Sequence, residues 1–256
     1  MRKLSSLAAL ICLSLSGPAA ALDLKLTATY QLNRPASLDY DPAFCGLWIA
    51  NESAEAVLVT LDGLELRRLT SDLSRIKAIT VEGNGLLVAD GYGGFQRLAK
   101  DGTQLSGAFN PNGWADTEGV TVTEDGTLIT VEDDPAAITW MTPEGRILKR
   151  IDANLLDPAL IEPQGIARDP RTGHLLIVDD WEGTNSLFEL DPDGVVLGTW
   201  SLYEYGQDPE GIAIRPGSNQ LFIAFDGGAR ISAFDYTPTL PAGTPLLPPG
   251  ADCAMF

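Results

Sequence analysis

Short apolar runs recur along the chain. Each run comes after a segment in which a small residue is followed by apolar residues at alternating positions. The clearest segments begin at Glu118, Gln164 and Glu210 and read EGVTV, QGIAR and EGIAI. Each is followed by a turn and then by an apolar run, LITV, LLIV or LFIA. Two weaker copies lie upstream, KAITV with LLVA and ASLDY with LWIA. The same pattern therefore occurs five times.

The spacing of the small residues identifies a repeat. These residues are Ser37, Ala78, Gly119, Gly165 and Gly211, at intervals of 41, 41, 46 and 46 positions. Self-similarity at a period of about 40 residues is typical of repeat architectures, propellers among them. Because each copy reads as short strands, we expect an all-β β-propeller with five blades.

Each repeat predicts four antiparallel strands, named A to D in chain order. Strand A holds the small residue, and strand B is an apolar run continuous enough to be buried on both faces. Strand C alternates more, and in four copies an Asp-Gly or Glu-Gly pair follows it, at residues 62, 101, 144 and 193. Glycine supplies the positive φ of a hairpin turn, so strand D follows. In the second copy we expect strand D at residues 103–105.

The fifth copy has no strand D of its own. Its strand C ends in ISAFD, and the chain from Thr237 onward is rich in proline and glycine. A spare strand lies near the N-terminus at residues 24–32. We expect it to complete the last blade and close the ring, which removes open sheet edges. A sixth blade would have to be irregular and lie within residues 100–117 or in the tail.

The first 21 residues have the pattern of a secretory signal peptide. A basic start precedes an apolar run of about 12 residues and then three alanines, and the run is too short to span a bilayer as a helix. We expect cleavage after Ala21, a secreted or periplasmic location, a propeller over residues 22–236, and a tail over residues 237–256 packed on it. The alternative is an uncleaved anchor. After cleavage we expect no membrane insertion, and a monomer.

Two cysteines remain after cleavage, Cys45 and Cys253. An exported protein holds such a pair as a disulfide, and this one would draw the tail across the closure seam. Two free thiols are the alternative.

The charge balance is strongly acidic. The full chain has a net charge of −18, and loss of Arg2 and Lys3 with the leader leaves 15 basic against 35 acidic residues, a net charge of −20. Such a field repels nucleic acid and attracts cations, so we expect no nucleic-acid partner. Solubility alone would also explain most of the charge.

Two blocks of the sequence resemble known families. DTEGV with DGTLITVED, from Asp116, and EPQGIARDP with GHLLIVDD, from Glu162, resemble the SdiA-regulated and phytase-like esterase propellers and, more loosely, NHL-type propellers. The resemblance spans residues 36–236. It implies a propeller that is often exported, and several members bind calcium in the central channel. Five blades depart from the six common in these groups.

One recurring position precedes the small residue of strand A. Its residues are Ala36, Lys77, Glu118, Gln164 and Glu210. Strand A lines the channel of a propeller, so these side chains should ring its mouth. Glu118, Gln164 and Glu210 offer the hard oxygen ligands that Ca²⁺ takes, and we expect this ion there. An internal ion pair with Lys77 is the alternative.

A second recurring polar position follows strand B. Its residues are Asn51, Asp90, Asp133, Asp180 and Asp226. Because one occurs in every blade, we expect a structural ring in which each side chain accepts backbone N–H bonds from its loop. Around the same face we expect Tyr92, Trp114 and Trp181 to stack on a flat ligand, with inter-blade packing as the alternative.

Several enzyme classes lack their residues. There is no Gly-x-Ser-x-Gly motif, and the single histidine, His174, is expected to be exposed in the hairpin between strands A and B. We therefore expect a binding or interaction module with Ca²⁺ at its mouth and an extracellular or small-molecule ligand. The alternative is a calcium-dependent hydrolase of esters, lactones or phosphoesters, in which Glu118 or Glu132 is the general base.

Overall fold

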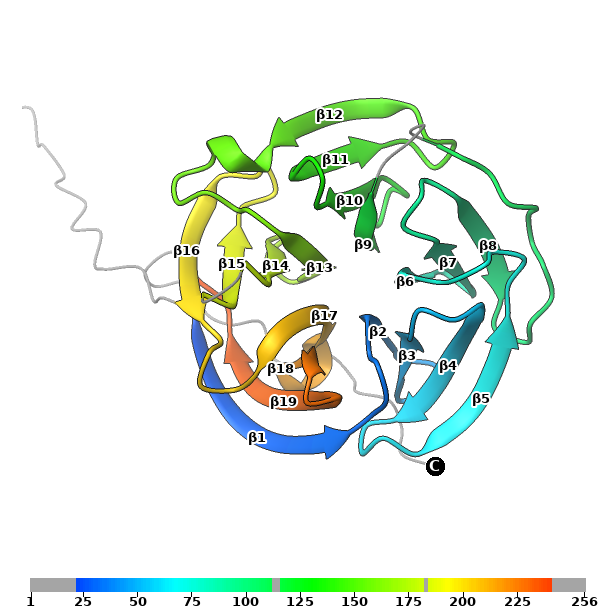
Figure 1. The fold of residues 1–256 in the computed structure, drawn as a ribbon, viewed down its shortest axis with the longest axis horizontal. Helices are drawn as coiled ribbons and strands as arrows, with labels where there is room; N and C mark the ends of the chain where they lie inside the picture. The colour runs from blue at the N-terminus through cyan, green and yellow to red at the C-terminus, as the bar shows by residue number, and fades with distance from the viewer. Residues whose placement is uncertain (1–21, 112–115, 182–183, 241–256) are drawn as a thin grey trace, which may run out of the picture.

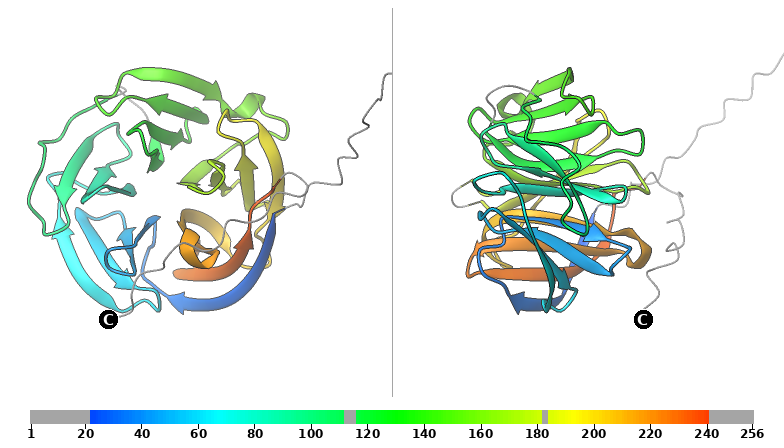
Figure 2. Two further views of the ribbon diagram at one scale, coloured as in Figure 1. Left: turned by 180° about the vertical axis from the view of Figure 1, so that it is seen from behind. Right: turned by 90° about the vertical axis from the view of Figure 1, so that its right-hand side faces the viewer.

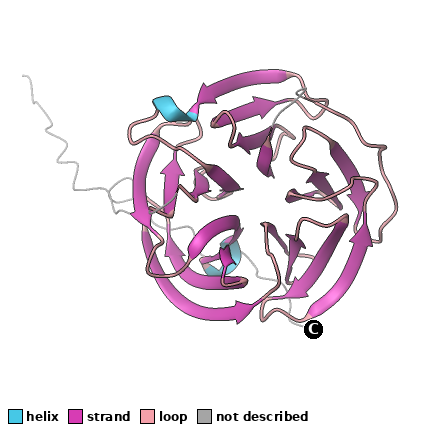
Figure 3. Cartoon of the chain, viewed as in Figure 1, coloured by secondary structure: helices cyan, strands magenta, loops and turns pink. Residues whose placement is uncertain are grey.

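The computed structural model describes residues 22–111, 116–181 and 184–240, which form a five-bladed β-propeller (Figure 1). Strands make up most of these residues (Figure 3). The blades surround one axis, as the views from behind and from the side show (Figure 2). No helix in this part of the chain is long and apolar enough to cross a membrane. The predicted signal peptide, Trp114 and Cys253 lie outside the described residues.

Each blade is an antiparallel sheet whose strands follow one another from the axis outward, except that the outermost strand of blade 5 is β1. Blade 1 contains β2 (Ser37–Asp41), β3 (Gly46–Ala50), β4 (Glu55–Thr60) and β5 (Glu65–Thr70). Blade 2 contains β6 (Ala78–Glu82), β7 (Gly85–Ala89) and β8 (Phe95–Ala99). Blade 3 contains β9 (Thr117–Val122), β10 (Leu128–Glu132), β11 (Ala137–Met141) and β12 (Ile147–Asp152). Blade 4 contains β13 (Pro163–Arg168), β14 (Leu175–Asp179), β15 (Ser186–Leu190) and β16 (Val196–Ser201). Blade 5 contains β17 (Gln207–Arg215), β18 (Gln220–Gly227), β19 (Arg230–Thr237) and β1 (Asp23–Gln31). Two short 3₁₀ helices, η1 (Ala153–Leu155) and η2 (Pro216–Ser218), lie in connections.

The N-terminal strand closes the ring as predicted. Strand β1 pairs antiparallel with β19, from Asp23 opposite Thr237 to Gln31 opposite Arg230. The backbone N–H of Leu22 also donates to the Thr239 hydroxyl at 3.1 Å. The all-β fold and the count of five blades are therefore confirmed.

The predicted strand D of blade 2, at residues 103–105, is wrong. The blade 2 sheet has three strands in the described chain, and two isolated bridges, Leu98–Gln104 and Phe95–Phe109, occupy the place of the fourth. The segment between them reads LSGA, and residues with low strand propensity such as glycine and alanine do not sustain a continuous ladder. The Gln96 side chain, fully buried, also bonds to the Ser106 carbonyl at 3.4 Å.

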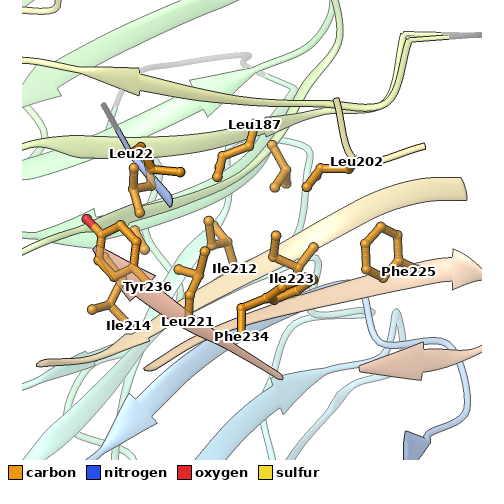
Figure 4. Close-up of a cluster of buried hydrophobic side chains, with 13 residues drawn as sticks. Leu22, Leu187, Leu202, Ile212, Ile214, Leu221, Ile223, Phe225, Phe234 and Tyr236 are labelled. Atoms are coloured by element: carbon orange, nitrogen blue, oxygen red, sulfur yellow. The ribbon is translucent and has the colours of Figure 1, made fainter. Parts of the chain in front are cut away.

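The core lies between neighbouring blades. Every residue of β3, β7, β10 and β14 is buried, as continuous apolar runs predict. Figure 4 shows one interface, where Leu187 and Leu202 of blade 4 face Ile212, Ile223 and Phe234 of blade 5. Burying a side chain of this kind contributes roughly 1.5–3 kcal/mol.

Glycine in the innermost strands permits close approach between blades. A Cβ atom at Gly119 would lie 2.6 Å from the Gln164 carbonyl oxygen, and one at Gly165 would lie 2.6 Å from the Glu210 carbonyl oxygen. Either contact is too short for a side chain. The repeated glycine therefore lets β9, β13 and β17 crowd together around the axis and places the preceding polar residues at the channel.

Candidate functional site at the mouth of the channel

The innermost strands β2, β6, β9, β13 and β17 all begin at the same end of the axis, which we call the mouth (Figure 1). Strand β10 ends at the mouth, because its last residue, Glu132, pairs with Thr117 at the start of β9 and with Ala137 at the start of β11. The loop before strand A and the loop after strand B therefore lie at the same end of the blade. Lys77, Glu118, Gln164 and Glu210 therefore come from four different blades to one place. A glycine that packs closely against the next blade follows Glu118, Gln164 and Glu210, whereas Ala78 follows Lys77.

Lys77 forms the centre of this group. Its Nζ lies 2.8 Å from Glu118 Oε2, 3.1 Å from Glu210 Oε2 and 3.6 Å from Glu52 Oε1. These ion pairs connect blades 1, 2, 3 and 5 across the axis. The ammonium group thus lies between Glu118 and Glu210, two of the predicted calcium ligands. This is the internal ion pair that the sequence offered as the alternative to calcium.

Burial shapes the protonation of the three central groups. Burial disfavours the charged form of Lys77, but the carboxylates of Glu118 and Glu210 outweigh it and raise the lysine pKa. Burial raises the pKa of Glu118 to about 7 although Lys77 lowers it, and the pKa of Glu210 is raised in the same way. One ammonium therefore does not fully compensate two buried carboxyl groups, and Glu118 titrates near neutral pH.

Four further carboxylates form an acidic cluster on the side of blades 3 and 4: Asp116, Asp133, Glu162 and Asp180. The Asp133 N–H donates to the Asp116 carbonyl at 3.3 Å, and the Asp180 N–H donates to the Glu162 carbonyl at 3.2 Å. Burial, then Glu162 and Asp116, raises the pKa of Asp133 to about 6. Burial, then Glu210 and Glu162, raises the pKa of Asp180. Among the described residues no lysine, arginine or histidine makes a salt bridge to the cluster.

Gln164 joins the acidic cluster to the channel. Its Nε2 lies 3.4 Å from Asp180 Oδ1, and the residue is 6% exposed. Its Oε1 is buried and accepts no hydrogen bond from any described residue. An unsatisfied buried acceptor costs roughly 1–3 kcal/mol. Among the described residues, the mouth thus holds an amide oxygen without a donor next to carboxylates without a salt-bridge partner.

The predicted structural ring after strand B divides into two kinds of environment. Asp90 Oδ1 accepts the N–H groups of Tyr92 at 2.7 Å and Gly94 at 2.9 Å, and Asn51 Oδ1 accepts the Ser53 hydroxyl at 2.7 Å. These are local loop contacts. Asp133 and Asp180 instead belong to the acidic cluster, and Asp226 lies beside Glu210 in a small cavity.

The aromatic residues that we expect to stack on a ligand lie in different surroundings. Tyr92 is 53% exposed, and the Arg75 guanidinium lies 4.4 Å from its ring centre. Trp181 is exposed beside a cavity of about 180 Å³ that Phe188 also lines. The two side chains are therefore available at the surface on blades 2 and 4.

Glu132, the second candidate general base, is buried within blade 3. Its carboxylate accepts the Thr139 hydroxyl at 2.9 Å and pairs with Arg150 at 2.7 Å. Those partners belong to β11 and β12, on the side of the blade away from the axis. This geometry gives Glu132 a structural ion pair between strands.

His174 lies in the hairpin between β13 and β14, as predicted, but it is not an exposed turn residue. Its Nδ1 lies 2.8 Å from Glu189 Oε1, and its side chain is 14% exposed. The expectation was wrong because Glu189 comes from β15, a partner that the hairpin sequence alone does not reveal. This pair sits at the opposite end of the blades from the mouth, as does Cys45, in the turn between β2 and β3.

Sequence reasoning missed a third recurring position, three residues before the small residue of strand A. Its residues are Arg34, Arg75, Asp116, Glu162 and Asp208. Both arginines pair with Glu52, Arg75 at 3.8 Å, whereas Asp116 and Glu162 build the acidic cluster. The repeat alignment itself carried this signal. Charge is thus divided at the mouth, with arginines on blades 1 and 2 and acids on blades 3 and 4.

The fold and this site define the protein as a five-bladed β-propeller with a polar channel mouth. No protein-family model matches the sequence, and no curated protein matches it at a significant level. A solved structure with a similar fold is the glutaminyl cyclase of Myxococcus xanthus, with a TM-score of 0.68 and 13% identity over 85% of this chain and 97% of that one. Weaker similarity extends to hydrazine synthase of Kuenenia stuttgartiensis, with a TM-score of 0.49, 15% identity, and 76% and 56% coverage. A protein of unknown function from Bacteroides caccae has a TM-score of 0.48, 14% identity, and 74% and 70% coverage. At these identities the cyclase likeness shows a shared fold.

Proposed function

We propose that this protein is a ligand-binding propeller whose mouth binds a small molecule through a protonated amine. The observation that carries the proposal is the buried Gln164 Oε1, which has no donor among the described residues, beside Asp133 and Asp180, which make no salt bridge there. An ammonium group has three N–H donors and one positive charge. It would satisfy the amide oxygen and neutralise the cluster at the same time.

An organic ammonium suits this site better than the calcium ion that the sequence predicts. Ca²⁺ takes six to eight converging oxygens, but among the described residues no three His, Cys, Asp or Glu side chains are arranged to hold a metal. Lys77 already supplies positive charge between Glu118 and Glu210. Calcium binding, which the resemblance to SdiA-regulated and phytase-like propellers implies, remains the alternative. A secreted or periplasmic location is proposed separately, from the signal-peptide pattern of the first 21 residues.

A pair of matched ligands tests the proposal. Glycyl-glycinamide carries a free α-amine, and its N-acetyl form does not. We expect calorimetry to show binding of the amine and loss of roughly tenfold or more in affinity on acetylation, because a charge-assisted hydrogen bond contributes about 1.5–3 kcal/mol. Gln164→Leu and Asp180→Asn should each weaken binding. The matched control is Glu144→Gln, an exposed acid in the turn between β11 and β12 at the other end of the blade.

Two results would decide against the amine. Equal affinity for the free and acetylated dipeptides contradicts it directly. Heat on addition of CaCl₂, with a melting temperature that falls in EDTA and is insensitive to the dipeptides, would establish the calcium alternative instead.

A second candidate function is proton-transfer catalysis at the same mouth. The supporting observation is Glu118, whose raised pKa of about 7 places a buried acid near the operating pH of a general acid or base. A protein of similar fold is a glutaminyl cyclase. In a cyclisation of that kind, an N-terminal glutamine α-amine would attack its own side-chain carbonyl and release ammonia. One group must remove the amine proton and one must protonate the leaving nitrogen.

Ammonia release from glutaminyl-glycine measures this activity directly. We expect turnover that Glu118→Gln reduces by roughly 10²-fold or more, within the range of a lost general acid–base. Parallel assays on ester, lactone and phosphoester substrates, with Ca²⁺ or EDTA, test the hydrolase alternative. If the protein binds the amine ligand but turns over none of these substrates, ligand binding is its function.

A further inference from the structure

A second cavity lies on the axis at the end opposite the mouth. Its volume is about 280 Å³, and every innermost strand contributes to its wall, with Tyr40, Val81, Val122, Arg168 and Ile214 among the lining residues. Val122 follows Glu118 by four positions along β9. At about 3.3 Å per residue, the cavity is therefore about 13 Å from the Lys77 centre, and we call it the rear pocket.

The walls of the rear pocket combine apolar and polar side chains, and seven of its thirteen lining residues are apolar. Three prolines, Pro42, Pro170 and Pro216, follow the innermost strands of blades 1, 4 and 5 and line it together with Ile214. The Tyr40 ring belongs to the same wall, and the Arg215 guanidinium lies 5.8 Å from its centre. Pockets for organic ligands typically hold about 300–1,000 Å³, so this one suits a small molecule with an apolar body.

One cationic side chain is fixed in this wall and has a partner that is easy to replace. Arg168 Nη1 lies 2.7 Å from Glu124 Oε1, yet the Arg168 side chain is only 19% exposed while that of Glu124 is 66% exposed. An ion pair with so exposed a partner contributes little to stability. A ligand carboxylate could therefore take the place of Glu124 on the guanidinium at small cost.

The other acid of the pocket does not compete for Arg168. Asp39 Oδ2 accepts the Val81 N–H at 2.7 Å and the Thr80 hydroxyl at 2.8 Å, and its Oδ1 accepts the Tyr40 N–H at 2.8 Å. These bonds tie blade 1 to blade 2 and use both oxygens. The Thr121 hydroxyl lines the pocket and has no hydrogen-bond partner among the described residues.

We propose that the rear pocket is a second ligand site, which binds a small organic carboxylate. The carboxylate pairs with Arg168, and the apolar body of the ligand packs against the prolines and Tyr40. A single guanidinium beside an apolar surface of prolines and Tyr40 fits a monoanion rather than a phosphate, which needs more donors. This site does not depend on the amine site at the mouth.

Two fluorinated probes test the proposal by ¹⁹F NMR titration of the full chain. 4-Fluorobenzoate carries the negative charge, and 4-fluorobenzamide is its neutral counterpart. We expect the benzoate to bind, and Arg168→Gln to weaken it by about tenfold or more, because the ligand loses a hydrogen bond to a charged group. Glu124→Gln should tighten binding roughly two- to fivefold, because it removes the competing carboxylate.

A matched variant and the direction of the Glu124 effect keep the test decisive. Arg146→Gln removes an exposed arginine at the start of the outer strand of blade 3 and should leave binding unchanged. A gain of affinity in Glu124→Gln cannot arise from unfolding. Equal binding of benzoate and benzamide, or an unchanged affinity in Arg168→Gln with a normal melting temperature, would overturn the proposal.

Discussion

The buried ammonium of Lys77 balances the negative charge of the carboxyl groups at the mouth. Among the described residues it is the single ammonium that pairs with both Glu118 and Glu210, and all three side chains are at least four-fifths buried. Removal of one partner from a buried ion pair leaves an uncompensated charge, which typically costs 3–5 kcal/mol. The effect of the lysine on stability should therefore far exceed that of a surface lysine.

Lys77→Met tests this dependence. We expect the variant to lose about 3–5 kcal/mol of unfolding free energy at pH 8 and less at pH 5, where Glu118 and Glu210 can bind protons. Urea denaturation at both pH values measures the difference. Lys25→Met, at an exposed position of β1, is the control and should change little. A loss at pH 8 no larger than that of the control would contradict the role of the lysine.

Glu118 also makes the stability of the folded protein depend on pH. Its pKa rises from 4.5 to about 7 on folding, so the folded chain holds a proton that the unfolded chain has released. Between these values the unfolding free energy therefore falls as pH rises, by roughly 3 kcal/mol in all. Asp133, raised from 3.8 to about 6, acts in the same direction at lower pH. Glu118→Gln should flatten the profile measured between pH 4.5 and 8, and a wild-type profile that rises there would refute this assignment.

The same protons compete with an amine at the mouth. As Asp133 and Glu118 ionise, the negative charge that attracts an ammonium group increases. We expect the affinity for glycyl-glycinamide to rise between pH 5 and 7.5, while the α-amine itself stays largely protonated over most of this range. Calorimetry across the range measures this trend. An affinity that is independent of pH would show that these carboxyl groups do not contact the ligand.

At the scale of strands, glycine at the start of β13 sets how closely the blades approach. A Cβ atom at Gly165 would lie 2.6 Å from the Glu210 carbonyl oxygen and 3.0 Å from Gly211 Cα, both of them backbone atoms. Gly165→Ala should therefore destabilise the protein by about 1–3 kcal/mol in urea denaturation. Gly107→Ala meets no atom within 4 Å and is the control. Equal stability of the two variants would show that the strands separate freely.

The strands were largely predictable because a blade is a local structure. Neighbouring strands are joined by short turns, so the glycine spacing and the apolar runs alone indicate five sheets and the borrowed strand. The sequence could not show that residues 103–109 make only isolated bridges, since a short polar segment can either pair or bulge. It also could not orient Glu132, because a strand buried on both faces carries no alternation that distinguishes them.

The candidate site was predictable as a set of positions, and its pairings were not. The repeat alignment indicates that Lys77, Glu118, Gln164 and Glu210 share the mouth. Which of them pair depends on side chains from blades that lie more than 40 residues apart. The contact of His174 with Glu189 and that of Arg168 with Glu124 also depend on partners that are distant in the sequence, Glu189 on β15 and Glu124 in the turn after β9.

At the scale of the whole molecule, β1 closes the ring by pairing with β19. A chain that lacks residues 22–32 would expose the edge of β19, and open edges favour association between molecules. We expect this truncated chain to elute as oligomers or aggregates in size-exclusion chromatography with light scattering. A synthetic peptide of residues 22–32 should partly restore the monomer by adding the strand in trans. A monomeric truncated chain of unchanged stability would contradict this role.

This closure also sets an order of events during synthesis. The first strand of the propeller to leave the ribosome is the one whose partner, β19, is made last. Blade 5 therefore stays incomplete until almost the whole chain has emerged, whatever the earlier blades do. Such a chain cannot complete its ring, or cover the open edge of blade 5, before β19 has been made.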